Sequence, residues 1–134
     1  MVRRRWKVLR QSAQDRVLVV AGGVTVAEAL SAHDELAATG SAIRVIDIFS
    51  VQPADGDAPV AAARACGGVV ITVEDHYAHG GIGDTVLAAL ATERCVLHKL
   101  AVREIPHGGK PNELLDRYGI STRHIVAVVK AALE

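Results

Sequence analysis

The stretch that decides the fold is VVITVEDHYAHGGIGDTVLAAL, residues 69–90. It opens with an apolar run of strand length, Val69 to Val73, and closes with an apolar-periodic run, Val86 to Leu90. A polar, glycine-rich segment lies between them, so the stretch predicts a strand, a turn and a helix. In a parallel α/β sheet such a turn lies at the carboxyl edge of the strands, where binding and catalytic sites are usually built.

The same alternation continues on both sides of this stretch. After Gly22-Gly23, Thr25 and Glu28 have the spacing of a capping box, and Gly40 is placed to end the helix that follows. Strands that alternate with helices predict a single three-layer α/β/α domain on a mostly parallel sheet. The other predicted strands are residues 16–21, 42–49 and 95–102, and the other predicted helices are residues 58–65, 111–119 and a last helix from Ser121.

The length of 134 residues suits one domain with one core. Hydrophobic residues make up 50% of the chain but aromatic residues only 3%, so the core must be built from Ala, Val, Leu and Ile. We assign residues 1–15 to an N-terminal arm, in which Val8-Leu9 is a candidate edge strand. Residues 16–134 form the predicted domain.

The charge balance and the cysteines exclude several classes of protein. The 15 basic and 15 acidic residues cancel, which gives no global attraction to nucleic acid or to an anionic membrane. A run of about 18 apolar residues, as a membrane span needs, is absent from the sequence. Cys66 and Cys95 lack metal-site or redox-motif spacing, which favours reduced thiols and a cytoplasmic location.

The polar segment offers candidate chemistry without completing a known motif. Asp75, His76 and His79 are suitable metal-ligand types, but their spacing matches no familiar metal motif, and a polar turn is the favoured interpretation. The sequence also lacks a Gly-x-Ser-x-Gly nucleophile elbow. The residues alone therefore predict no catalytic, cofactor-binding or metal-binding set.

Two glycine pairs allow two interpretations. Gly81-Ile82-Gly83 begins like a dinucleotide fingerprint but lacks the third glycine, and Gly22-Gly23 has Asp47 on the next strand, where a ribose-binding acid would lie. Both turns place backbone N–H groups at helix N-termini, which can bind anions weakly. The favoured alternative is close packing of helix on strand, which needs small residues.

The segment from Val73 to Tyr77, followed by Gly80-Gly81-Ile82-Gly83, resembles the C-terminal domain of transketolase in its animal-like branch. Four further segments agree with that family in the same order, and the resemblance covers the chain from about Arg16 onward. These segments are residues 20–30, 43–53, 100–106 and 109–120.

The resemblance implies a five-stranded mixed sheet whose first strand is antiparallel. It also implies an enzyme that uses thiamine diphosphate and Mg²⁺ to move a two-carbon ketol unit from a ketose phosphate to an aldose phosphate, in the pentose phosphate pathway. Two larger preceding domains of the family hold the cofactor, the metal and the activating glutamate. None of those motifs matches a position here, so no catalytic residue is carried over and the isolated chain is expected to be inactive.

The resulting hypothesis is a structural and assembly domain. Its expected partners are the cofactor-binding domains, or an N-terminal subunit of a split enzyme, together with homodimer contacts; nucleic acid and membrane are not expected partners. The alternatives are an autonomous nucleotide- or phosphate-binding module, a metal-dependent hydrolase, and the equivalent domain of 1-deoxyxylulose-5-phosphate synthase or of the 2-oxoacid dehydrogenase E1 β subunit. The candidate interface or anion contacts are Glu74, Asp75, His76, Tyr77, Gly80, Gly81 and Gly83.

Overall fold

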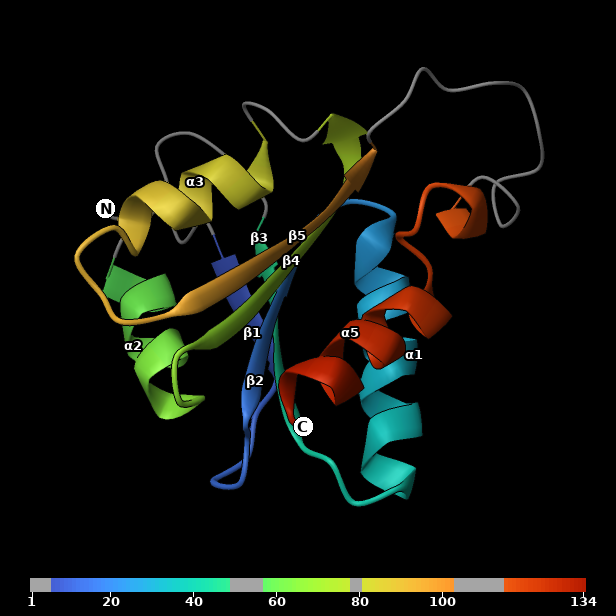
Figure 1. Cartoon of the computed structure of the whole chain (residues 1–134), viewed down its shortest axis with the longest axis horizontal. Helices are drawn as coiled ribbons and strands as arrows, with labels where there is room; N and C mark the ends of the chain where they lie inside the picture. The colour runs from blue at the N-terminus through green and yellow to red at the C-terminus, as the bar shows by residue number, and fades with distance from the viewer. Residues whose placement is uncertain (1–5, 49–56, 78–80, 103–114) are drawn as a thin grey trace.

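A five-stranded mixed sheet forms the centre of the molecule (Figure 1). The computed structural model describes residues 6–48, 57–77, 81–102 and 115–134. The strand order is β1-β3-β2-β4-β5; β1 is antiparallel to β3, and the other pairs are parallel. This confirms the expected fold class and the antiparallel first strand. The strands are β1 (Trp6–Arg10), β2 (Val17–Ala21), β3 (Ile43–Ile48), β4 (Val69–Tyr77) and β5 (Val96–Val102).

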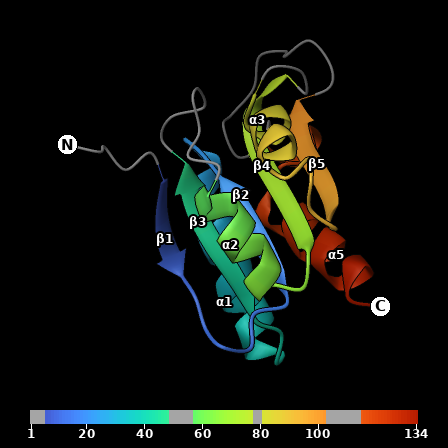
Figure 2. The ribbon, with the colours of Figure 1, turned by 90° about the vertical axis from the view of Figure 1, so that its left-hand side faces the viewer.

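Helices cover both faces of the sheet, which gives the three layers seen in Figures 1 and 2. Helices α1 (Thr25–Ala38) and α5 (Thr122–Ala132) lie on one face, and α2 (Asp57–Ala65) and α3 (Ile82–Ala89) lie on the other. None of the helices within the described residues has the length and apolar character needed to cross a bilayer.

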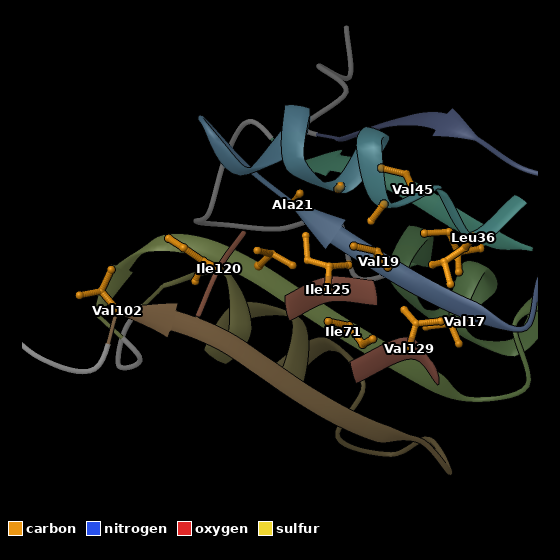
Figure 3. Packing of buried hydrophobic residues seen from close by; sticks show 14 residues of the cluster. Val17, Val19, Ala21, Leu36, Val45, Ile71, Val102, Ile120, Ile125 and Val129 are labelled. Carbon is orange, nitrogen blue, oxygen red and sulfur yellow. The ribbon is translucent and has the colours of Figure 1, made fainter. Parts of the chain in front are cut away.

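The sheet divides the core into two clusters. Along β2, Val17 and Val19 point toward α1 and α5, whereas Leu18 and Val20 point toward α2 and α3. All five residues of β2 are buried, as expected for a central strand covered on both faces. Figure 3 shows the first cluster, in which Ile125 lies over the sheet from the last helix.

The first half of the polar segment is strand rather than turn. We expected the strand to end at Val73, but β4 continues to Tyr77, so this boundary was wrong. The reason is the neighbouring strand: pairing with β5 resumes at Tyr77 and Val102 after an irregularity between Val73 and Tyr77. An irregularity of this kind changes the local twist and allows polar residues to continue a strand.

The capping box predicted for the first helix was also wrong. Thr25 is the first residue of α1, the N-cap is Val24, and no side chain caps the helix. The Thr25 hydroxyl is instead directed back to the backbone of Gly22 and Val73. Glu28 accepts a hydrogen bond from the Thr122 hydroxyl of α5 at 3.2 Å.

The predicted helix of residues 111–119 falls largely outside the described residues. The described part resumes at Leu115 with three helical residues, and Gly119 adopts a φ of 74°. Ser121 then serves as the N-cap of α5, close to the start predicted for the last helix.

Candidate functional site

The turn after β2 lies beside β4 and the start of α3, near the carboxyl edge of the two central strands. Ala21 at the end of β2 is the register partner of Val73 in β4. Gly22 follows the first of these residues and begins the turn after β2, whereas Glu74 follows the second and continues β4, so the two segments singled out by the sequence lie side by side. Contacts from α3 then join them.

The buried carboxylate of Glu74 lies beneath the start of α3. Glu74 is 1% exposed, and its Oε2 accepts a hydrogen bond from the backbone N–H of Gly83 at 2.6 Å. This bond occupies one of the N–H groups that have no partner within a helix, at the end of the helix where negative charge is favoured. A Cβ at Gly81 would lie 1.6 Å from Oε1 of Glu74, so the carboxylate needs glycine at position 81.

Asp75 has the opposite environment. It is exposed, and it points to the face of the sheet opposite to that of Glu74, because successive side chains of a strand alternate between the two faces. Its Oδ1 lies on the side of Gly23, 3.8 Å from the position that a Cβ of that glycine would take. Gly23 has a φ of 62°, a conformation that L side chains rarely adopt. Asp75 and the backbone of this turn therefore share one exposed surface.

Gly83 allows close packing between α3 and the sheet. A Cβ at this position would lie 2.7 Å from Cε of Lys99 and 3.0 Å from Oγ1 of Thr72. Nζ of Lys99 contacts Oδ1 of Asp84 at 2.5 Å, which pairs β5 with the first turn of α3. The Thr72 hydroxyl is fully buried and has no hydrogen-bond partner among the described residues.

The turn after β2 is held by Thr25 and filled by Ile82. Oγ1 of Thr25 accepts the N–H of Gly22 at 3.1 Å, and it lies 2.8 Å from each of two carbonyl oxygens, those of Gly22 and Val73, either of which can accept its proton. A Cβ at Gly22 would lie 2.6 Å from Cδ1 of Ile82. The space beside this glycine is therefore occupied by a side chain of α3.

Other polar groups give little indication of catalysis. Asp47 faces Lys7 across β1 and β3; burial raises the pKa of this carboxyl, and the charge of Lys7 opposes that effect. Burial raises the pKa of the Cys66 thiol to about 11, so the reactive thiolate is disfavoured at neutral pH. The residues described by the structure contain no group of three or more His, Cys, Asp or Glu side chains that could hold a metal ion.

The structure brings together only some of the predicted contact residues. The carboxylate of Glu74 lies against Gly81 and accepts a hydrogen bond from Gly83, so these three residues are in mutual contact. Asp75 is next to them in the sequence but is exposed. Tyr77 ends β4, and its side chain, like that of His76, lies outside the described residues, as do His79 and Gly80. The roles predicted for this set as interface or anion contacts stay predictions.

Sequence reasoning missed the residues that hold the turn after β2 and the start of α3 against the sheet. The signal for Thr72 was the alternation of β4, because Thr72 and Glu74 are two positions apart and share a face. No local pattern identified the others, since their partners lie far along the chain. The missed residues are Thr25, Thr72, Ile82 and Lys99.

Comparison with known proteins agrees with this architecture. A family model described as the C-terminal domain of transketolase matches residues 5–125. The chain is 54% identical to transketolase-like protein 2 of Mus musculus and 45% identical to transketolase of the same species, in each case over 92% of this chain and 20% of the relative. A solved structure described as "Split gene transketolase, inactive beta4 tetramer" superimposes on this chain with a TM-score of 0.86 at 38% identity. The match covers 96% of this chain and 42% of that one. The chain belongs to the transketolase C-terminal domain family.

Proposed function

We propose that this domain is the structural and assembly domain of a thiamine diphosphate-dependent transketolase, which transfers a two-carbon ketol unit from a ketose phosphate to an aldose phosphate. One observation carries the proposal: 92% of the chain aligns with a transketolase, yet it spans only 20% of that relative's length. A domain of this size supplies one part of such an enzyme. The complete enzyme would act in the pentose phosphate pathway, and two free cysteines support a cytoplasmic location.

We propose that the carboxyl edge does not hold the cofactor of the complete enzyme. The spaces beside Gly22 and Gly81 are occupied by the side chains of Ile82 and Glu74, and the described residues provide no cluster of three metal ligands. We therefore assign thiamine diphosphate and Mg²⁺ to the rest of the enzyme and derive no catalytic step within this chain.

The proposed partners are the cofactor-binding domains, or an N-terminal subunit that carries them, with homodimer contacts in the assembled enzyme. Val24 offers a position at which to test the carboxyl edge as a contact surface. It is an apolar residue at the turn after β2, yet it is 56% exposed. A single exposed apolar side chain is common on protein surfaces, so this position serves to test the proposed contact and does not establish it.

The decisive experiment is an assay of ketol transfer with thiamine diphosphate, Mg²⁺, xylulose 5-phosphate and ribose 5-phosphate. The chain is tested alone and mixed with the polypeptide that the immediately upstream DNA encodes. Activity of the mixture but not of either component supports the assembly role. Activity of this chain alone would contradict it.

A matched pair of variants tests the contact surface. Val24→Asp places a charge at the carboxyl edge, and Leu87→Asp places one on α3 at a position that is 49% exposed. We expect Val24→Asp to prevent the recovery of activity and Leu87→Asp to permit it. Calorimetric titration of the isolated chain with NAD, ATP and sugar phosphates tests the alternative: saturable binding would favour an autonomous phosphate-binding module.

A further inference from the structure

The turn after β2 and the start of α3 are joined by side chains rather than merely adjacent. We infer that Glu74 is a positioning residue that sets, through the first turn of α3, the geometry of the turn formed by residues 22–25. The positioning itself depends only on contacts within this chain. Its importance for docking rests on the proposed function.

The first step is the attachment of α3 to β4. The Glu74 carboxylate is buried and accepts the Gly83 N–H at 2.6 Å. A buried hydrogen bond is not weakened by competition from water. Because Gly81 lacks a side chain, the carboxylate can approach the helix from below. Glu74 thereby fixes the height of the first turn of α3 above the sheet.

The second step is the contact from α3 to the turn after β2. Ile82 directly precedes Gly83 and is buried. Its Cδ1 occupies the place where a side chain of Gly22 would lie, 2.6 Å from a Cβ built there. Well-packed interiors transmit displacement because they contain few voids. A shift of the first turn of α3 must therefore move Ile82 against, or away from, the backbone of Gly22.

The third step closes the connection back to β4. Thr25 accepts the Gly22 N–H and reaches the carbonyl of Val73, the residue before Glu74. The same short segment of β4 thus holds α3 through the side chain of Glu74 and holds α1 through the carbonyl of Val73. The position of the exposed Val24, between Gly22 and Thr25, depends on both attachments.

Amide hydrogen exchange in the isolated chain tests this inference residue by residue. In Glu74→Ala we expect exchange at Gly83 to accelerate several-fold to roughly tenfold, as loss of a buried hydrogen bond predicts. We also expect faster exchange at Gly22 and Val26, beyond any change in global unfolding. Glu74→Gln retains an oxygen acceptor and should restore much of the protection at all three amides.

The matched control is Asp84→Asn. This variant weakens the ion pair of the same helix turn with Lys99 but leaves the Glu74 contact in place. We expect it to leave exchange at Gly22 and Val26 unchanged. If Glu74→Ala accelerates exchange at Gly83 alone, or if Asp84→Asn disturbs Gly22 as much as a Glu74 variant does, the inference is wrong.

Two further comparisons keep the test decisive. Should Glu74→Ala fail to fold, the amide chemical shifts of Gly22 in Glu74→Gln and Asp84→Asn give the same comparison, with the larger displacement expected in Glu74→Gln.

Ketol transfer is measured separately in the mixture with the upstream polypeptide. Coupled exchange without recovered activity would retain the positioning role and refute the version of the assembly role in which the upstream polypeptide is the partner. Recovered activity with uncoupled exchange would support the assembly role and refute the positioning role.

Discussion

Oγ1 of Thr25 lies 2.8 Å from the carbonyl oxygen of Val73, so the first residue of α1 is tied to β4 across 48 positions of sequence. The same atom accepts the buried N–H of Gly22. One hydroxyl therefore closes the turn after β2 and attaches it to the neighbouring strand. A valine of nearly the same shape could do neither.

Thr25→Val is expected to destabilise the protein by about 2 kcal/mol, because it leaves the buried Gly22 N–H without a partner. Thr25→Ser keeps the hydroxyl and loses one methyl group, which should cost about 1 kcal/mol. Urea unfolding of the two variants measures the difference. A valine variant as stable as the serine variant would show that the hydroxyl contributes nothing.

Gly22→Ala is expected to destabilise by about 1–3 kcal/mol, because the added methyl group would overlap Cδ1 of Ile82. Ile82→Val removes that atom at a cost of about 1 kcal/mol. We expect the double variant to be more stable than the sum of the single changes by at least roughly 0.5 kcal/mol, as for residues in contact. If the free-energy costs of the two single changes simply add, the cost of Gly22→Ala does not come from overlap with Ile82.

Thr72→Val is expected to stabilise the protein by about 1 kcal/mol, because it replaces a buried hydroxyl that has no partner among the described residues with a methyl group of similar size. Thr72→Ser is the control: it keeps the hydroxyl and removes the methyl group, so it should destabilise. Thermal unfolding ranks the three proteins. A less stable valine variant would mean that the hydroxyl is hydrogen-bonded in solution.

The contribution of Asp116 to stability should depend on acidic pH. The hydrogen bond from Arg123 lowers the pKa of this carboxyl from 3.8 to about 2; desolvation opposes this effect, and the Ser121 hydroxyl adds to the lowering. Since the folded-state pKa lies below the unfolded-state value, the stabilisation is complete above about pH 4 and is lost as pH falls toward about 2. NMR titration of the Asp116 carboxyl measures its folded-state pKa directly.

The control for that titration is Arg123→Gln, which removes the exposed partner of Asp116. The pKa of the carboxyl should then rise toward its ordinary value, and the loss of stability should begin at higher pH. An unchanged titration in this variant would assign the shift to other neighbours. Added salt should also raise the pKa of Asp116, because Asp116 and Arg123 are both exposed to solvent and salt screens their attraction.

Local patterns were sufficient to predict most of the fold. The apolar run of β2, five buried residues with glycines after it, was recognisable as a central strand. The alternation of strands and helices predicted the layers. The antiparallel direction of β1 could not be predicted from a local pattern in its five residues. It followed from the family resemblance alone.

The site could be predicted only in part, as the adjacent acids Glu74 and Asp75 show. Both appeared to belong to one polar turn, yet one is buried beneath α3 and the other is exposed. Which acid points inward depends on the length and register of β4, and these depend on pairing with β5. The contact of Gly22 with Ile82 joins positions 60 residues apart, so no local signal could reveal it.

The packing of the last helix on the first determines when the fold can be completed during synthesis. Ile125 and Val129 of α5 are fully buried in the cluster that also contains Val17 and Leu36 (Figure 3). While a ribosome is still making the chain, the strands and α1 emerge first and expose that half of the core to water. The domain therefore reaches its native state only after Val129 has left the exit tunnel, and until then part of the surface that will form its core stays open to water.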